Sequence, residues 1–173
     1  NGLLLLSNSN SSGGNTNLII SKLDTSANEI QSAEIAFGDA AYPTDIVEKS
    51  GAYYVSGYLF NGQTIGFLFK IDTGLSNIEW TIRLDNPAGC ELQELVLDDT
   101  LLRAYGWTGS GSNGSLLVFE SDTNGNVISS HAFSKEGFFS VTDVFLENDQ
   151  DYIHGFRRSF LGNLEEEFIG YYD

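Results

Sequence analysis

The sequence predicts an all-β fold made of β-propeller-type repeats, each a four-stranded antiparallel blade, with about three and a half blades present. Three observations support this prediction. A repeat of about 50 residues runs through the whole chain of 173 residues. Val, Ile, Thr and aromatic residues, which favour strands, are frequent. Runs of helical period with capping residues are absent. A fixed period of this size is typical of stacked units that bury their apolar faces against one another.

Two kinds of residue mark the repeat. An aspartate ends a strand-like run in every unit, at Asp24, Asp72, Asp122 and Asp173. A glycine precedes the last three aspartates, at Gly57, Gly106 and Gly155. We interpret both sets as structural turn markers, because an aspartate at a turn accepts backbone N–H bonds from the residues that follow it.

We treat residues 1–173 as a single repeat module with units of approximately 1–49, 50–99, 100–148 and 149–173, the last incomplete. In the first unit we expect strands over residues 3–7, 17–24, 29–36 and 44–48. In the second we expect them over 52–59, 65–72, 77–84 and 92–97. In the third we expect them over 101–108, 115–122, 126–133 and 140–146. The incomplete unit supplies strands over 151–157 and 166–172.

Apolar patterns and turn residues justify these strands in order. The run Leu3–Leu6 is apolar on both faces, as is typical of a strand covered on each side. The segment Ile65–Ile71 has apolar residues at every odd position, and Leu116–Phe119 is again apolar throughout. The pair Asn124-Gly125 supplies a turn with positive φ between two strands. We expect each unit to form one blade, with its first strand lining a central channel and its last strand outside.

The connections between strands divide into two sets on opposite faces of such an assembly. Those between the first and second strands vary in length and are rich in Gly, Ser and Asn, so we expect partner contacts on their rim. They span residues 8–16, 60–64, 109–114 and 159–165. The opposite face is expected to collect acidic residues, namely Asp24, Asp72, Asp98, Asp99, Asp122, Glu147, Asp149 and Asp151.

Composition limits the partners. The formal net charge of −16 disfavours nucleic acid and anionic membrane surfaces, because both would repel it. It favours solubility, or alternatively a surface for cations or basic partners. The chain has no apolar stretch of membrane-spanning length and no signal peptide, so membrane insertion is not expected. It contains no methionine, so we expect a processed product or an excised piece. The single cysteine, Cys90, is interpreted as a small buried residue.

Three segments of the second unit resemble a known bacterial repeat. These are Tyr54-Val55-Ser56-Gly57-Tyr58, the run Gly66–Asp72 and Ile78-Glu79-Trp80. They are similar to propeller-type repeats of secreted and cell-surface proteins, especially those of Bacteroidota. Two departures occur: Glu120 replaces the repeat's lysine in the third unit, and Trp80 has no counterpart in the neighbouring units.

The resemblance implies a role in binding or display, an extracellular or cell-surface location and a larger parent protein. Open blade edges would then need cover from further blades or from other chains. It also raises three candidate glycosylation sites. Thr100, in Asp99-Thr100-Leu101, matches the O-glycan acceptor pattern of Bacteroidota. Asn10 and Asn113 match N-glycan sequons.

The chemistry of the expected channel argues against catalysis. Glycoside hydrolysis needs two facing carboxyl groups, and Asp151 is the only acid near the strands expected to line the channel. We therefore expect no enzymatic activity. We also expect no cofactor, although Asp98-Asp99, Asp149/Asp151 and the segment Asp122–Asn126 leave a weak possibility of Ca²⁺. His131 and His154 lack the neighbours that a zinc site needs.

Three arginines fall on or beside the strands expected to line the channel: Arg103, Arg157 and Arg158. One hypothesis is that they contact an anionic group in the channel. The alternative is that their stems are packed and their guanidinium groups pair with local acids.

The sequence therefore predicts a non-catalytic recognition or scaffold module that binds a protein or glycan through its rim loops. Two alternatives stay open. One is a structural subunit or fragment whose open blade edges are completed by other chains. The other, less favoured, is part of a propeller enzyme whose active residues lie outside this segment.

Overall fold

The computed structural model describes residues 2–10, 16–109, 114–134, 138–148, 150–158 and 165–172. Fourteen strands and no helix occur in these residues. The all-β prediction is therefore confirmed. Since the described part of the chain has no helix, it also has none long and apolar enough to cross a membrane.

The strands form four sheets, in which every hydrogen-bonded pair of strands is antiparallel and consecutive in the chain. The first sheet consists of β1 (Leu3–Asn10), β2 (Thr16–Leu23) and β3 (Glu29–Ile35). The second consists of β4 (Ala40–Lys49), β5 (Ala52–Phe60), β6 (Thr64–Asp72) and β7 (Ile78–Leu84). The third consists of β8 (Cys90–Asp98), β9 (Leu101–Thr108), β10 (Ser115–Asp122) and β11 (Val127–Ser134). The fourth consists of β12 (Phe138–Glu147), β13 (Gln150–Arg158) and β14 (Glu165–Tyr172).

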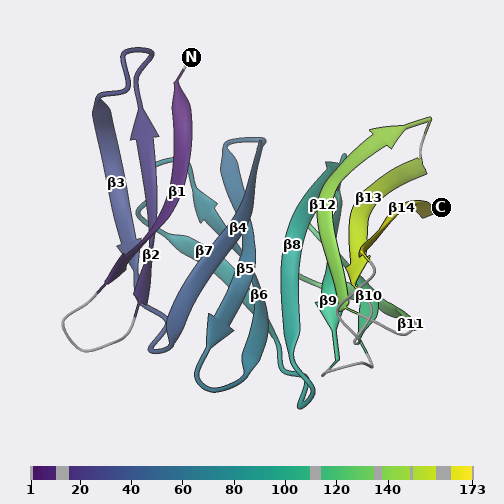
Figure 1. The fold of residues 1–173 in the computed structure, drawn as a ribbon. Helices are drawn as coiled ribbons and strands as arrows, with labels where there is room; N and C mark the ends of the chain where they lie inside the picture. The colour runs from purple at the N-terminus through teal and green to yellow at the C-terminus, as the bar shows by residue number, and fades with distance from the viewer. Residues whose placement is uncertain are drawn as a thin grey trace.

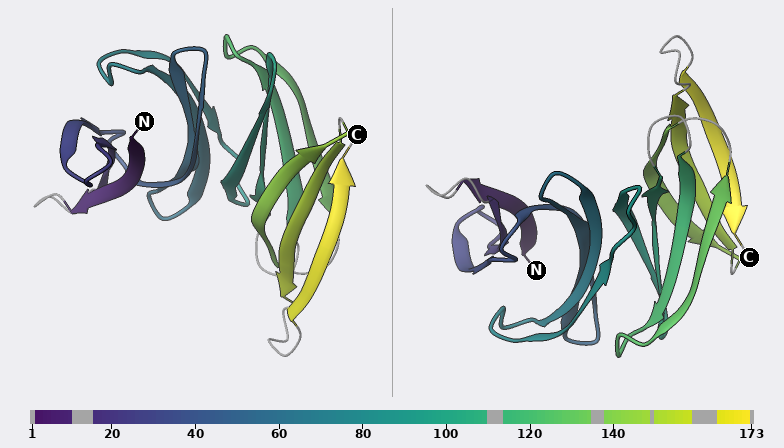
Figure 2. Two further views of the ribbon diagram at one scale, coloured as in Figure 1. Left: turned by 90° about the horizontal axis from the view of Figure 1, so that it is seen from above. Right: turned by 90° about the horizontal axis from the view of Figure 1, so that it is seen from below.

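The four sheets follow one another in chain order, and the two ends of the chain lie at opposite sides of the row (Figures 1 and 2). Within the described residues the end sheets have three strands each and the middle sheets have four. This succession of antiparallel sheets is that of propeller-type blades, as the sequence predicts.

The grouping of strands into sheets differs from the expectation. The last strand of each unit was expected on the outside of its own blade, yet β4 pairs with β5 and β8 pairs with β9. A tight turn joins β4 to β5 and another joins β8 to β9, and these turns bring the strands of each pair together. Ser50 and Gly51, with φ of 54° and 77°, close the β4–β5 hairpin, and Asp99 (φ 44°) lies in the β8–β9 turn. Two residues with positive φ match the twist of a two-residue hairpin.

The strands next to the shared axis are therefore β4, β8 and β12. β4 contacts β8, and β8 contacts β12. The strands that were expected to line the channel, namely β5, β9 and β13, are second in their sheets. We call β4, β8 and β12 the inner strands. In the first sheet β1 corresponds to β5 in the repeat, so among the described residues this sheet has no inner strand.

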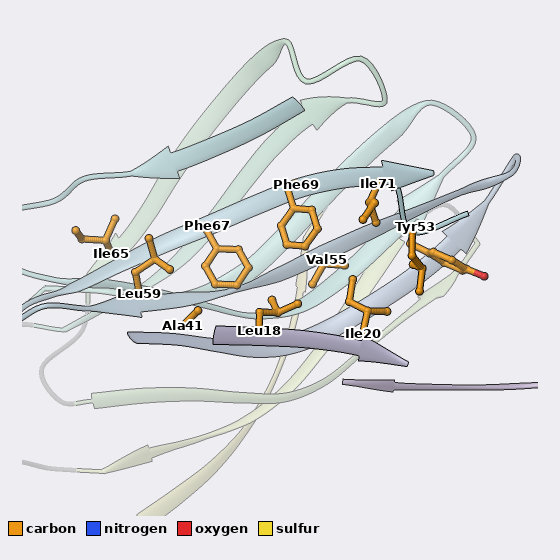
Figure 3. Packing of buried hydrophobic residues seen from close by; sticks show 11 residues of the cluster. Leu18, Ile20, Ala41, Tyr53, Val55, Leu59, Ile65, Phe67, Phe69 and Ile71 are labelled. Atoms are coloured by element: carbon orange, nitrogen blue, oxygen red, sulfur yellow. The ribbon is translucent and has the colours of Figure 1, made fainter. Parts of the chain in front are cut away.

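Three hydrophobic clusters hold neighbouring sheets together, one at each junction. Figure 3 shows the cluster between the first two sheets, where Phe67 and Phe69 of β6 lie against Leu18 and Ile20 of β2. All four side chains are fully buried. Burying one such side chain stabilises a fold by about 1.5 to 3 kcal/mol. The junctions between sheets therefore contribute substantially to the stability of the fold.

Each inner strand carries a β-bulge opposite one of the marker glycines. The bulges fall between Pro43 and Asp45, between Leu92 and Glu94, and between Val141 and Asp143. A Cβ added to Gly57, Gly106 or Gly155 would stand 2.2, 1.9 or 2.3 Å from a carbonyl oxygen of the bulged strand. These glycines therefore lie inside strands, and the close approach of the bulged backbone explains why the repeat has glycine there.

The bulges also join one sheet to the next. The hydroxyl of Thr44, in the bulge of β4, donates a hydrogen bond of 2.8 Å to the carbonyl oxygen of Leu92. The side-chain oxygen of Gln93, in the bulge of β8, accepts one of 2.7 Å from the backbone N–H of Val141. The inner strands are thus connected through equivalent positions of the repeat.

Candidate functional site

The marker aspartates are turn residues. A carboxylate oxygen of Asp24 accepts hydrogen bonds of 2.8 and 2.9 Å from the backbone N–H groups of Ser26 and Asn28. Asp72 and Asp122 make the same kind of bond in their own turns. The pKa of Asp122 is lowered, first by the side-chain hydrogen bond from Asn126 and then by its backbone N–H. The fourth marker, Asp173, lies outside the described residues.

Hydrogen bonds within these turns occupy the carboxylate oxygens that a calcium ion would need as ligands. Both carboxylate oxygens of Asp122 accept hydrogen bonds from Asn126, one from its backbone N–H and one from its side chain. Nowhere in the described residues do three or more His, Cys, Asp or Glu side chains gather in a way that would hold a metal ion. Asp149 lies outside those residues.

Arg103 and Asp151 form a buried ion pair between the third and fourth sheets. The Nη2 group of Arg103 donates a hydrogen bond of 3.0 Å to Asp151, and its Nε group and the hydroxyl of Tyr105 donate to the same carboxylate. The side chain of Asp151 is fully buried and that of Arg103 is 10% exposed. Burial, and next the hydrogen bond to Asp151, raise the pKa of Tyr105. Arg103 thus pairs with a local acid, and Asp151 does not belong to the acidic face.

A cavity of about 400 Å³ lies further out between the same two sheets. Its lining comes from the ends of β10 to β14 next to the variable connections of the third and fourth units. This is the rim on which partner contacts were expected. The apolar part of the lining consists of Leu116, Phe133, Phe139 and Phe168. Phe139 and Phe168 meet edge to face, with ring centroids 5.9 Å apart.

The polar part of this lining holds Arg157, Glu166 and Glu167 together with Ser134. The Nη2 group of Arg157 forms an ion pair of 2.7 Å with Glu166. Its Nε group is buried and has no partner among the residues that the structure describes. The cavity therefore combines aromatic walls, the guanidinium group of Arg157 and carboxylate acceptors. Concave sites with apolar walls and a few converging polar groups are typical of ligand pockets.

Three acids occupy the same repeat position on the inner strands: Asp45, Glu94 and Asp143 each follow the bulge of their strand. Burial, and then the charges of Asp45 and Asp143, raise the pKa of Glu94 to about 7. Asp45 also accepts a hydrogen bond of 2.8 Å from the backbone N–H of Leu95. Sequence reasoning missed this group because it placed the wrong strands next to the axis. Their equal spacing of 49 residues was the signal that could have found them.

The other candidate residues are scattered. Thr100 is exposed in the β8–β9 turn. Asn10 ends β1 and the rest of its sequon lies outside the described residues, as does Asn113. Arg158 pairs in the backbone register with Phe138. Cys90 is buried as expected, and burial raises the pKa of its thiol to about 12, so it stays protonated and inert.

No protein-family model and no curated protein matches this chain. Two solved structures are similar to it. One, from a study of two prolyl endopeptidases, has 10% sequence identity and a TM-score of 0.44 over 98% of this chain and 27% of that one. The other is a provisionally assigned 6-phosphogluconolactonase from Bacteroides fragilis, with 14% identity and a TM-score of 0.48 over 98% of this chain and 58% of that one. The chain thus spans less than two thirds of either protein.

Both of these proteins are named as enzymes. The expectation that the chain is not an enzyme is therefore contradicted, and we do not retain it. At such identities and TM-scores the likeness transfers neither an activity nor a substrate to this chain.

Proposed function

We propose that this chain is a recognition module of a propeller-type protein and binds a glycan in the cavity between its third and fourth sheets. The observation that carries the proposal is the lining of this cavity, in which three aromatic rings stand beside the guanidinium group of Arg157 and the carboxylates of Glu166 and Glu167. A ligand hydroxyl can accept a hydrogen bond from this guanidinium group, and a hydrogen bond to a charged group contributes about 1.5 to 3 kcal/mol.

The chemistry of the lining favours a sugar. Sugar hydroxyls both donate and accept hydrogen bonds, so they match Arg157 as a donor and Glu166 as an acceptor. The apolar faces of a sugar ring match the rings of Phe133, Phe139 and Phe168, which line the same space. A cavity of about 400 Å³ is within the usual range for small-ligand sites.

The proposal includes a secreted or cell-surface location, supported by the resemblance of the repeats to those of such proteins. It also includes further blades in a larger parent protein, supported by the end sheets of only three described strands. A protein segment in the same cavity is the alternative partner, since Arg157 would equally bond a peptide carbonyl.

A glycan array probed with the chain tests the proposal, followed by calorimetry with the best glycan that the array returns. Replacing Arg157 by Met removes the donor and is expected to weaken binding by about 1.5 to 3 kcal/mol, roughly 10- to 100-fold. Arg83→Met is the matched control, because Arg83 forms an ion pair with Asp39 in a different part of the chain. Binding should be unchanged in that control.

Two results would contradict the proposal. The array could return no glycan, or the Arg157→Met variant could bind as tightly as the unchanged chain. If a displayed peptide library instead returns a ligand that Arg157→Met no longer binds, the same cavity recognises protein.

A further inference from the structure

A second cavity, of about 420 Å³, lies between the second and third sheets. We call the cavity between the third and fourth sheets the first cavity. The lining of the second cavity includes Thr108, the last residue of β9, and Cys90, the first residue of β8. It therefore lies at the same end of the third sheet as the first cavity. Further blades at either end of the row would leave it unchanged, because the chain itself supplies the sheets on both sides.

The second cavity offers polar groups that suit sugar hydroxyls. The side-chain amide of Asn86 donates a hydrogen bond of 2.7 Å to the hydroxyl of Thr108, which donates one of 3.0 Å to a backbone carbonyl oxygen. Both groups are thus held in place, and Ser130 adds an exposed hydroxyl. Amide and hydroxyl groups match sugar hydroxyls, which donate and accept hydrogen bonds. The apolar lining includes Leu84, Cys90, Leu117 and Ala132.

Arg83 also borders the second cavity, but its charged group belongs to the other face of the second sheet. Its cross-strand partner Phe67 lies in the cluster shared with the first sheet, whereas Leu84 packs against the cluster shared with the third. Successive residues of a strand point to opposite faces. The guanidinium group forms its ion pair with Asp39, so Arg83→Met remains a valid control.

One hairpin separates the two cavities. In the β10–β11 hairpin Leu116 pairs with Phe133, and the next residues, Leu117 and Ala132, pair with each other. The first pair lines the first cavity and the second pair lines the second cavity. Neighbouring pairs point to opposite faces of a sheet, and stacked sheets lie about 10 Å apart, so the centres of the two cavities are separated by roughly the same distance. The cavities therefore lie back to back, with a single sheet between them.

The outer edge of this hairpin connects the two cavities. Among the described residues β11 is the last strand of its sheet and pairs only with β10. Ala132 and Phe133 are both exposed on this strand, Phe133 to 47%. The unpaired edge of a sheet presents backbone N–H and C=O groups, to which sugar hydroxyls can bond. A glycan that crosses the edge therefore finds hydrogen-bonding groups between the two cavities.

We propose that the two cavities are subsites for one linear oligosaccharide, which crosses the edge of β11 at Ala132 and Phe133. This inference rests on the proposed function, since it takes the first cavity as a glycan site. Its support is the placement of two cavities of similar size on the two faces of one hairpin. A short glycan occupies one cavity. A longer one occupies both, and its second contact is intramolecular once the first has formed.

A glycan array that carries each sugar sequence as a length series, from monosaccharide to hexasaccharide, tests the inference, followed by calorimetry on the series that binds. Affinity should rise at least about tenfold once the glycan is long enough to reach the second cavity. Ala132→Trp fills the second cavity from an exposed position, so it should abolish this gain and leave the binding of short glycans unchanged. Ile128→Trp is the matched control. Ile128 lies on the same strand, is 58% exposed and is not part of the described lining of either cavity, so this variant should bind every length like the unchanged chain.

A thiol introduced by Ala132→Cys reports where the glycan lies. Long glycans should slow its reaction with iodoacetamide, and short ones should not. The thiol introduced by Ile128→Cys should react at the same rate with and without glycan. Cys90 adds little to the signal, because it is buried and the pKa of its thiol is raised to about 12.

The outcomes separate this inference from the proposed function. If affinity does not rise with length, or if Ala132→Trp keeps the gain, the first cavity binds alone, so the inference is wrong and the proposed function stands. If long glycans protect the thiol at position 132 but Arg157→Met binds them as tightly as the unchanged chain, only the second cavity binds and both proposals are wrong. An array that returns no glycan also contradicts both.

Discussion

The carbonyl oxygen of Glu91 lies so close to Gly106 that a Cβ at position 106 would stand 1.9 Å from it. The contact arises because the bulge of β8, between Leu92 and Glu94, presses its backbone toward β9. Gly57 and Gly155 face the bulges of β4 and β12 in the same way. The repeat thus depends on a packing constraint that only glycine meets.

Replacing Gly106 by Ala should lower the free energy of unfolding by about 2 to 4 kcal/mol, because either the bulge or the β8–β9 ladder must shift. Urea denaturation measures the change. Gly170→Ala is the control: Gly170 lies in β14, and an added Cβ there would have nothing within 4 Å. Equal effects at the two positions would refute the explanation of the marker glycines.

Removing one partner of the buried ion pair between Arg103 and Asp151 should lower the free energy of unfolding. Asp151→Leu leaves the buried Arg103 uncompensated and should lower stability by about 3 to 5 kcal/mol. The double variant Arg103→Leu/Asp151→Leu should recover much of that loss, since no buried charge remains. A double-mutant cycle by urea denaturation measures the coupling. Asp99→Asn breaks the exposed pair with Lys49 and should change stability by less than about 1 kcal/mol.

The stability of the fold should fall as the pH rises from about 4.5 to about 7 because of Glu94. Its pKa in the folded chain is about 7, above the ordinary value of 4.5, since burial and the charges of Asp45 and Asp143 disfavour ionisation. In that window the folded chain keeps a proton that the unfolded chain has lost, and above pH 7 the full cost is present.

Glu94→Gln should remove this contribution, so the difference in stability between variant and unchanged chain should grow from pH 5 to pH 8. Urea midpoints at both pH values measure it. Glu34→Gln is the control, because the pKa of Glu34 is lowered by hydrogen bonds from Asn17 and Ser9 and lies outside the window. If the difference for Glu94→Gln is the same at both pH values, the pKa of Glu94 is not raised in the folded chain.

Asp122→Ala should destabilise the β10–β11 hairpin, because the backbone N–H groups of Asn124 and Asn126 lose their acceptor. Asp122→Asn keeps an acceptor oxygen and should retain most of the stability. In the unchanged chain this contribution should persist above the ordinary aspartate pKa of 3.8 and fade as the pH falls through the lowered pKa of Asp122. Thermal unfolding of the three proteins, compared at pH 7 and pH 3, measures both effects.

The sequence predicts the positions of the strands well, but it does not predict correctly which strands belong to the same sheet. The strand expected over residues 52–59 is Ala52–Phe60, and the one expected over 115–122 is Ser115–Asp122. Alternation of apolar residues locates such segments. A repeat, however, has no intrinsic starting point, so its spacing alone does not say which strand begins a sheet. The tight turn at Ser50-Gly51 decides that, and the bulge after Pro43 obscures the alternation that would have revealed the full length of β4.

The candidate site is less accessible to sequence reasoning. The variable connections of the third and fourth units adjoin strand ends that line the cavity, and Arg157 is among the candidates that the sequence offers. Phe133, Phe139 and Phe168 come from three different strands, and no spacing in the chain links them. Their convergence depends on how the third sheet packs against the fourth, which is a property of the tertiary structure.

Strands that pair only with their neighbours in the chain also affect how the protein is made. Every hairpin closes over a short stretch of polypeptide, so its loop-closure entropy is small for a β protein. During synthesis each sheet can therefore form on the ribosome as soon as its last strand emerges, and it becomes the template against which the next one collapses. The growing chain needs no distant segment to shield its newest strands, which shortens the time during which they are exposed to aggregation.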